Sequence, residues 1–155
     1  MGMYIVSSCL LGQNCKYNGG NNLCQEVVEF CEEKKYITVC PESAAKLPCP
    51  RPPAERIDDR VINNEGKDVT DAFVKGAKLS LGTCTTLAGV TGAELKGAIL
   101  KANSPSCGCG KIYDGTFSGT LTEGNGVFTE MLLEQGIPVI TEKDTETIKK
   151  WLAEE

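Results

Sequence analysis

The chain has 155 residues, of which 41% are hydrophobic and 24% charged, and its formal net charge at pH 7 is −5. An acidic chain without a run of Lys and Arg is not expected to bind nucleic acid, because such binding depends on clustered positive charge. Nine cysteines and no histidine exclude Ser-His-Asp and Cys-His catalysis, as well as any zinc site that needs imidazole.

Short apolar runs predict two buried strands in the N-terminal half, at residues 4–8 (YIVSS) and 36–39 (YITV). Each run leads directly into a cysteine, Cys9 and Cys40. Between the runs, Asn22 is expected to cap a helix that ends near Lys35. The proline-rich stretch that follows predicts irregular chain, and the next residues predict a hairpin that turns at 63–66.

The C-terminal half continues the alternation. A helix capped by Asp68 or Thr70 is expected to break at Gly89–Gly92, and residues 96–102 predict a third strand that leads into a Gly- and Ser-rich loop. Residues 112–121 predict a hairpin. A helix from Asn125 to Gly136, a strand over 137–140 and a last helix complete the chain. The pattern predicts one α/β domain over residues 1–155, with three layers and a mostly parallel sheet flanked by helices.

No stretch is long and apolar enough for a transmembrane helix, and the N-terminus lacks the basic-then-apolar pattern of a signal peptide. An odd number of cysteines in such a chain favours reduced thiols over a disulfide framework. The sequence therefore predicts a cytoplasmic protein without a membrane partner, and it is silent on the oligomeric state.

Three cysteines are expected to meet at one edge of the predicted sheet. Cys9, Cys40 and Cys107 each follow an apolar strand, and the carboxyl ends of parallel strands share one edge. Three thiols on one face suit an iron–sulfur cluster whose fourth iron is open. Such an iron is a Lewis acid that prefers a sulfur donor.

Oxygen-bearing side chains lie next to two of these cysteines. Glu42, two residues after Cys40, is placed to act as a general base toward a ligand at the site. Ser104 and Ser106, just before Cys107, offer hydroxyls that would position that ligand.

The spacing alone leaves other interpretations open. Cysteine packs as a small apolar side chain, so these could be buried thiols at strand ends. They could also hold zinc or copper in a non-catalytic metal-binding protein, in which Glu42→Ala would leave metal binding unchanged. A thiol redox role is disfavoured, because the chain has no C-x-x-C motif.

Several uncommon motifs occur together along the chain: SSCLLGQNCKYNGG, VCPES, PRPPAE, KDVTDAFVKGA and ILKANSPSCGCGKIYDGTFSG. With these motifs the sequence resembles a bacterial family, long catalogued as a domain of unknown function, that includes the thiouracil desulfidases. The resemblance extends from about Val6 to Gly136.

The resemblance implies a 4Fe–4S enzyme that removes sulfur from a small, nucleobase-like thiolated compound such as 2-thiouracil and releases sulfide without net redox change. It implies that Cys9, Cys40 and Cys107 bind the cluster, that Glu42 activates a water as the acid/base residue, and that Ser104 assists. The glycines beside Cys107 would leave room for the cluster next to the backbone.

Some positions depart from the family pattern. Asn18 stands where the family usually has an aspartate, which removes a carboxylate able to position water or substrate. Residues 43–46 replace a stretch that is usually apolar and contains glycine, and Cys49 and Cys109 look like additions. These departures leave the cluster ligands unchanged and bear on the identity of the substrate.

Two further residues are candidates for contact with the substrate, together with Ser106. Cys15 is expected near the site, with packing of its loop as the alternative. Arg51 has a planar guanidinium suited to a carbonyl or phosphate, and a salt bridge to Glu55 or another acid is the alternative. The remaining cysteines at helical spacing are expected to be structural: Cys24, Cys31 and Cys84.

Overall fold

The centre of the molecule is a four-stranded parallel β-sheet, seen in a computed structural model that describes residues 2–154. The strands lie in the order β2 (Tyr36–Val39), β1 (Gly2–Ser7), β5 (Glu94–Leu100) and β8 (Val139–Thr141). Every neighbouring pair is parallel. The chain leaves β1 toward β2 on one side and later enters β5 on the other, and ligands bind at such switch points, beyond the carboxyl ends of the strands.

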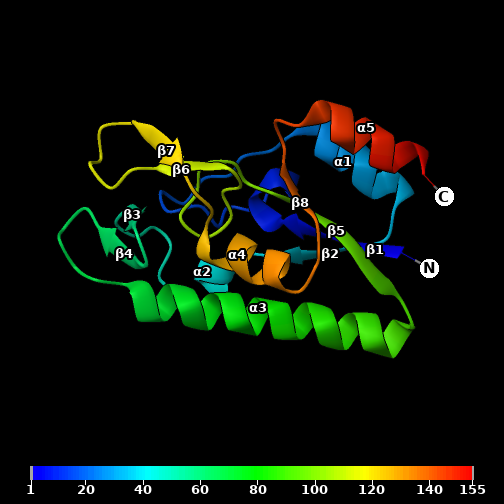
Figure 1. Cartoon of the computed structure of the whole chain (residues 1–155), viewed down its shortest axis with the longest axis horizontal. Coiled ribbons are helices and arrows are strands. Elements are labelled where there is room, and N and C mark those ends of the chain that lie inside the picture. Colours follow the sequence, from blue (N-terminus) through cyan, green and yellow to red (C-terminus); the bar gives the residue numbers. More distant parts are fainter. Residues whose placement is uncertain (1, 155) are drawn as a thin grey trace.

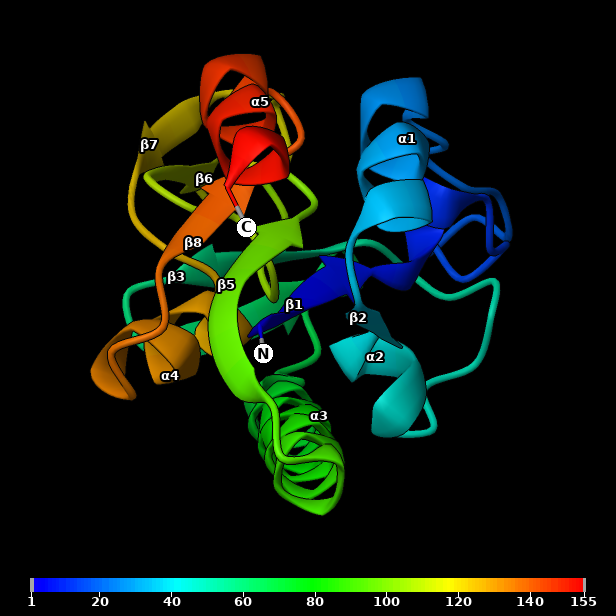
Figure 2. The ribbon, with the colours of Figure 1, turned by 90° about the vertical axis from the view of Figure 1, so that its right-hand side faces the viewer.

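Helices cover both faces of this sheet (Figure 2). On one face lie α1 (Gln25–Glu33) and α5 (Thr145–Ala153), and on the other lie α3 (Thr70–Thr91) and α4 (Val127–Glu134). The predicted three-layer α/β architecture is confirmed. None of the helices within residues 2–154 is long and apolar enough to cross a membrane.

The middle strand β1 contributes to both hydrophobic cores, because neighbouring side chains of a strand point to opposite faces. Ile5 is fully buried in the core formed with α3 and α4, whereas Tyr4 packs on the α1 and α5 side. There the Tyr4 ring meets Phe30 edge-on, with 4.9 Å between ring centroids, and lies 5.4 Å from Trp151. Trp151 is partly buried and packs against this core from the C-terminal helix.

Two antiparallel hairpins lie beyond the carboxyl ends of the sheet (Figure 1). β3 (Ala54–Ile57) pairs with β4 (Arg60–Asn63), and β6 (Lys111–Tyr113) pairs with β7 (Leu121–Glu123). β3 also contacts β6, so the two hairpins lie against each other along one side of the sheet edge. The hairpin predicted over residues 112–121 is confirmed.

The other predicted hairpin turns at a different place. The strands are joined at residues 58–59, where Asp58 has a left-handed φ of 54°. The expected turn at 63–66 exists but follows the hairpin: the Asn63 side chain accepts hydrogen bonds from the backbone N–H groups of Glu65 and Lys67. Asn63 binds the backbone just after it, so a strong local turn signal did not mark the hairpin turn.

Two asparagines that were expected to begin helices form hydrogen bonds to residues distant in sequence instead. The side-chain amide of Asn22 donates to the sulfur of Cys9 at 3.4 Å, and α1 begins further along the chain. The side-chain carbonyl of Asn125 accepts a hydrogen bond from the backbone N–H of Gly110 at 2.8 Å, and α4 begins after Asn125. In both cases a contact distant in sequence replaces the expected helix cap.

Glycine and proline mark two further helix boundaries. α3 runs through Gly89 and ends at Gly92, whose φ of 69° is the left-handed conformation common after helix ends. The stretch after Cys40, expected to be irregular, begins with a one-turn helix, α2 (Pro41–Ala44). Proline at the first position and an acidic residue in the first turn are the local signals for α2.

We expect Gly76→Ala to destabilise the protein by about 1–3 kcal/mol, because α3 touches α2 at this position. A methyl group there would lie 1.9 Å from the carbonyl oxygen of Pro41, and a backbone atom cannot rotate away. Gly82→Ala, on the same helix with no atom within 4 Å of the added methyl, should instead stabilise it by up to about 1 kcal/mol. Urea unfolding of both variants measures the difference; equal midpoints would contradict close contact between α3 and α2.

Candidate active site

A cavity of 560 Å³ opens beyond the carboxyl ends of β1, β2 and β5. The three cysteines that follow these strands, Cys9, Cys40 and Cys107, all line it, and so does Cys15. The expected meeting of three thiols from distant parts of the sequence is therefore present in the structure.

Cys9 is positioned by the turn that ends β1. A short 3₁₀ helix, η1 (Ser8–Leu11), carries it, and Gly12 closes this helix with a φ of 92°. The Cys9 side chain is nearly buried, and its sulfur accepts the hydrogen bond from Asn22 described above. Asn22 also lines the cavity. Sequence reasoning assigned it only to a helix cap.

Glu42 projects into the cavity from the first turn of α2, with both carboxylate oxygens engaged. Its Oε1 pairs with Arg51 Nε at 3.0 Å, and its Oε2 accepts from the Ser106 hydroxyl at 3.0 Å. The Arg51 side chain is only 6% exposed and donates its remaining bonds to the carbonyls of Pro48 and Cys15. Arg51 thus orients Glu42, and the expected alternative, a salt bridge to an acidic residue, is present with Glu42 rather than Glu55 as the partner.

The loop before Cys107 holds two serines in a fixed arrangement. Ser104 Oγ accepts from the backbone N–H groups of Ser106 at 3.1 Å and Cys107 at 2.9 Å, and it lies 3.0 Å from Ser106 Oγ. Because the Ser106 hydroxyl donates to Glu42, the Ser104 hydroxyl donates to Ser106. The result is a directed hydrogen-bond chain from Ser104 through Ser106 to Glu42.

The glycines beside Cys107 do not make room for a group in the cavity, contrary to expectation. A methyl group on Gly108 would lie 2.7 Å from Ile112 and 2.8 Å from the carbonyl of Ser104, so this glycine permits a tight turn within the loop. Gly110 has a φ of 83° and donates to Asn125. Both glycines shape the loop rather than the cavity.

Hydrogen bonds between thiols separate their pKa values. Hydrogen bonds from Cys15 lower the pKa of Cys9 and the pKa of Cys40 below the ordinary value, because the donor stabilises each thiolate. The same bonds, first to Cys40 and then to Cys9, raise the pKa of Cys15. Burial raises the pKa of Cys107 to about 12. Two thiols are thus prepared as thiolates, and Cys107 loses its proton only to a cation.

In the metal-free protein we expect Cys9 and Cys40 to be alkylated by iodoacetamide at lower pH than a free cysteine of pKa about 8.5. Only the thiolate reacts, so a lowered pKa moves the midpoint of the rate profile to lower pH. Cys15→Ala should move both midpoints upward, and Cys15→Ser, which keeps a hydroxyl donor, should move them less. Site-resolved mass spectrometry between about pH 5 and pH 10 measures this; unchanged midpoints in Cys15→Ala would contradict it.

The cysteines assigned to structure lie outside this cavity. Cys84 is fully buried on the inner side of α3, and Cys24, just before α1, and Cys31, within α1, are partly buried against the core on that side of the sheet. The Cys109 thiol points to the carbonyl of Val139 at 3.4 Å, on the core side of its loop. Cys49 is exposed, and its thiol donates to the carbonyls on either side of Cys15.

Polar residues also flank the loop of Cys107. Asp114 shapes a turn by accepting from Thr116. Lys101 pairs with Glu142 at 3.2 Å and is partly covered, whereas Lys111 is exposed.

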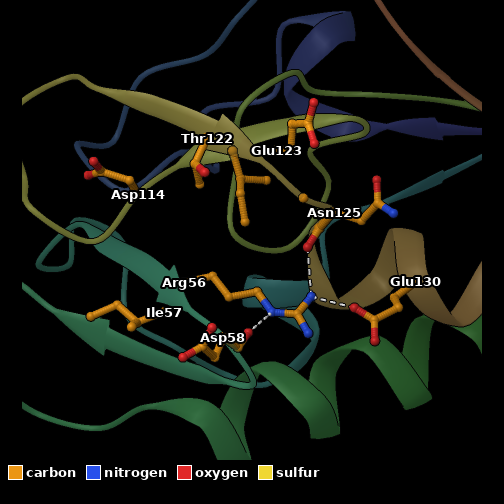
Figure 3. A pocket seen from close by; sticks show the side chains of 10 residues that line it. Arg56, Ile57, Asp58, Asp114, Thr122, Glu123, Asn125 and Glu130 are labelled. Carbon is orange, nitrogen blue, oxygen red and sulfur yellow. Dashed lines mark hydrogen bonds and ion pairs between the residues drawn. The ribbon is translucent and has the colours of Figure 1, made fainter.

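A second cavity, of 420 Å³, lies between β3, β7 and the start of α4 (Figure 3). Arg56 reaches across it from β3. Its guanidinium donates to the backbone carbonyls of Asp58 at 2.8 Å and Asn125 at 2.6 Å, and it pairs with Glu130 at 2.7 Å. These contacts connect the first hairpin to α4. Because the Arg56 guanidinium is already paired with these groups, it stabilises the hairpin beside the thiol cavity rather than forming an anion site.

Comparison with known proteins identifies the family. Residues 4–144 match the family described as 2-thiouracil desulfurase, which is most of the chain. The chain belongs to the 2-thiouracil desulfurase family. A solved structure named as the 4Fe–4S-dependent thiouracil desulfidase TudS is 38% identical, covers 99% of both chains and superposes with a TM-score of 0.86. An uncharacterised Bacillus subtilis protein, YbbK, is 37% identical over 94% of this chain and 99% of its own length.

Membership of the 2-thiouracil desulfurase family accounts for the sequence motifs, and the structure locates the departures from them. Asn18 lies in an exposed turn, where its side chain accepts from the backbone N–H of Gly20 at 2.9 Å. The neighbouring Tyr17 lines the cavity.

Proposed function

We propose that the chain, as one domain over residues 1–155, removes sulfur from a small thiolated compound such as 2-thiouracil and releases sulfide without net redox change. The observation that carries the proposal is a single cavity in which three strand-end thiols lie beside the Ser104–Ser106–Glu42 chain. A relative named as a thiouracil desulfidase, matched over almost the whole chain, supports the same chemistry.

A 4Fe–4S cluster held by Cys9, Cys40 and Cys107 fits the donor set, because cysteine thiolates are the ligands of such clusters. Within residues 2–154 no three Cys, Asp or Glu side chains are arranged to hold a single metal ion. A single zinc needs its sulfur donors about 2.3 Å from one point, whereas each thiolate of a cluster binds its own iron. When bound, the cluster supplies a Lewis-acidic iron with a position open to a sulfur donor.

Glu42 is the general base. Its carboxylate, oriented by Arg51, takes a proton from the water that attacks the thiocarbonyl carbon. One C–O bond forms and the C–S bond breaks. The water oxygen becomes the carbonyl oxygen, and both of its protons, one of them by way of Glu42, end on the departing sulfur, which leaves as H₂S, so no oxidant or reductant is consumed.

The two serines support Glu42 in its basic form. The Ser104 hydroxyl donates to Ser106 and the Ser106 hydroxyl donates to Glu42, each over 3.0 Å, so both hydrogen bonds favour the ionised carboxylate that takes a proton from water. Ser104 also accepts from two backbone N–H groups, which fix the position of its oxygen. Ser104 and Ser106 are therefore assigned to the support of Glu42.

Cys15 contributes a fourth thiol next to two of the ligands. Its hydrogen bonds stabilise the thiolates of Cys9 and Cys40 that a cluster requires. The carbonyl of Cys15 accepts from Arg51, which links its loop to Glu42. Its role is to prepare ligands and to border the substrate.

The test is anaerobic reconstitution with iron and sulfide, followed by incubation with 2-thiouracil. We expect about four iron and four sulfide per chain, visible absorbance of the cluster, and uracil and sulfide released in equal amounts. A protein that binds zinc but never takes up iron and sulfide would reject the proposal in favour of a non-catalytic thiolate metal-binding protein.

A further inference from the structure

The β6–β7 loop, residues 114–120, places an aromatic side chain at the cavity in an unfavourable backbone conformation. Phe117 lines the cavity, is 38% exposed and has a φ of 56°. A bulky non-glycine residue with positive φ is strained, and such strain persists only where the surroundings enforce it. Core packing does not account for Phe117, because a third of its surface remains open.

The conformation of this loop is enforced by Glu55. The carboxylate comes from β3 and is only 9% exposed, and one oxygen accepts from the backbone N–H groups of Gly115 at 2.9 Å and Phe117 at 3.1 Å. Converging backbone N–H groups form an anion-binding concavity. Gly115 lies so close to Ile57 that a methyl group would be 2.3 Å away. The loop is thus clamped on β3 without any ligand.

Two more aromatic side chains line the same cavity. Tyr17 comes from the loop after η1 and is exposed, and Tyr113 ends β6 and is partly exposed. The three aromatic residues therefore come from two segments far apart in sequence, around a cavity that also holds Glu42 and the thiols. Aromatic side chains bind the faces of planar bases by stacking.

We propose that Phe117, with Tyr17 and Tyr113, forms a stacking wall that selects thiocarbonyl compounds with a planar aromatic ring, and that Glu55 is the positioning residue that holds Phe117 in place. The inference rests on the proposed function for its thiocarbonyl substrate. It adds the residues that recognise the ring and the residue that positions them.

The test compares 2-thiouracil with 5,6-dihydro-2-thiouracil, which has the same thiocarbonyl edge but a saturated ring. Binding to the metal-free protein is measured by calorimetry, and KM for sulfide release is measured on the reconstituted enzyme. We expect the wild type to prefer 2-thiouracil by about tenfold in both, which corresponds to the stacking of one base. Phe117→Leu should reduce the preference to about twofold or less, and Phe117→Tyr should retain it.

Variants of Glu55 test the positioning role. Glu55→Ala should reduce the ring preference and speed hydrogen exchange at the amides of Gly115 and Phe117, while Glu55→Gln, which keeps an acceptor oxygen, should restore both. Leu121→Ala, at an exposed neighbouring site on β7, should change neither. Circular dichroism verifies that each variant is folded.

Equal loss of affinity for both compounds in Phe117→Leu, or no ring preference in the wild type, would overturn the stacking wall. Failure of the proposed function looks different: no sulfide would be released from either compound. The calorimetric preference for the aromatic ring would still decide the inference in that case.

Discussion

Replacement of Glu42 by Gln is expected to lower kcat for sulfide release by about 10²–10⁴-fold, with the fold and iron content unchanged. Glutamine has the same shape and keeps one carbonyl oxygen for a hydrogen bond, so the cavity wall is preserved. It cannot take a proton from water, and its NH₂ group faces either Arg51 or the Ser106 hydroxyl, where a carboxylate oxygen accepted a bond before. The substitution therefore removes the general base and interrupts the hydrogen-bond chain from Ser104 through Ser106 to residue 42.

The measurement is kcat per bound cluster, together with thermal unfolding of the same preparations. Glu29→Gln is the matched control, because it removes an exposed carboxylate of α1 on a surface away from the cavity. It should leave kcat unchanged. Activity of Glu42→Gln within tenfold of wild type, at equal iron content, would remove Glu42 from the role of general base.

Cys107→Ala is expected to abolish stable cluster loading and with it all sulfide release. Cys107 is 5% exposed and lines the cavity, and its sulfur lies 3.7 Å from the Ser106 hydroxyl. Cys109, the nearest thiol in sequence, cannot replace it, because Cys109 faces the core. Loss of one of three ligands should leave iron bound weakly or not at all.

Cys84→Ala provides the control matched for burial, since Cys84 is fully buried in the core under α3. Both substitutions remove one buried sulfur and should cost a similar ~1 kcal/mol of stability. Only Cys107→Ala should lose iron and sulfide in quantitative analysis and the visible absorbance. Full iron content in Cys107→Ala would show that the ligand set is different.

Loading should also release protons and weaken as pH falls. Burial holds the pKa of Cys107 near 12 in the metal-free protein, so this thiol carries a proton that iron must displace. Cys9 and Cys40 have lowered pKa values and are already partly ionised, so they release fewer protons when iron binds. The sulfur that binds last is therefore expected to be that of Cys107.

The layer architecture could be predicted from the sequence because it depends on local pattern. Short apolar runs such as YIVSS and YITV favour strands, although YITV at the sheet edge buries only alternate residues, and the amphipathic stretches between the strands favour right-handed crossovers. That geometry alone places the residues after β1, β2 and β5 at one edge. The convergence of Cys9, Cys40 and Cys107 followed from it.

The hydrogen-bond partners could not be predicted in this way. Arg51 pairs with Glu42 rather than with Glu55, although Glu55 lies closer in sequence and has the same charge. The choice depends on the path of the chain between α2 and β3, which brings Arg51 back over the cavity. For the same reason Asn22 and Asn125 do not cap helices: their side chains form hydrogen bonds with Cys9 and Gly110, which the fold brings next to them.

The sequence by itself determined the α/β class, the parallel sheet and the edge at which its thiols meet, because each depends on periodicity and strand direction. Only the tertiary structure decided that Ser106 joins Ser104 to Glu42, that Cys15 lies in the same cavity as Cys9 and Cys40, and that Glu55 holds the loop of Phe117 over the cavity. Those contacts form between segments that no local pattern relates, and they exist only once the hairpins close around the end of the sheet.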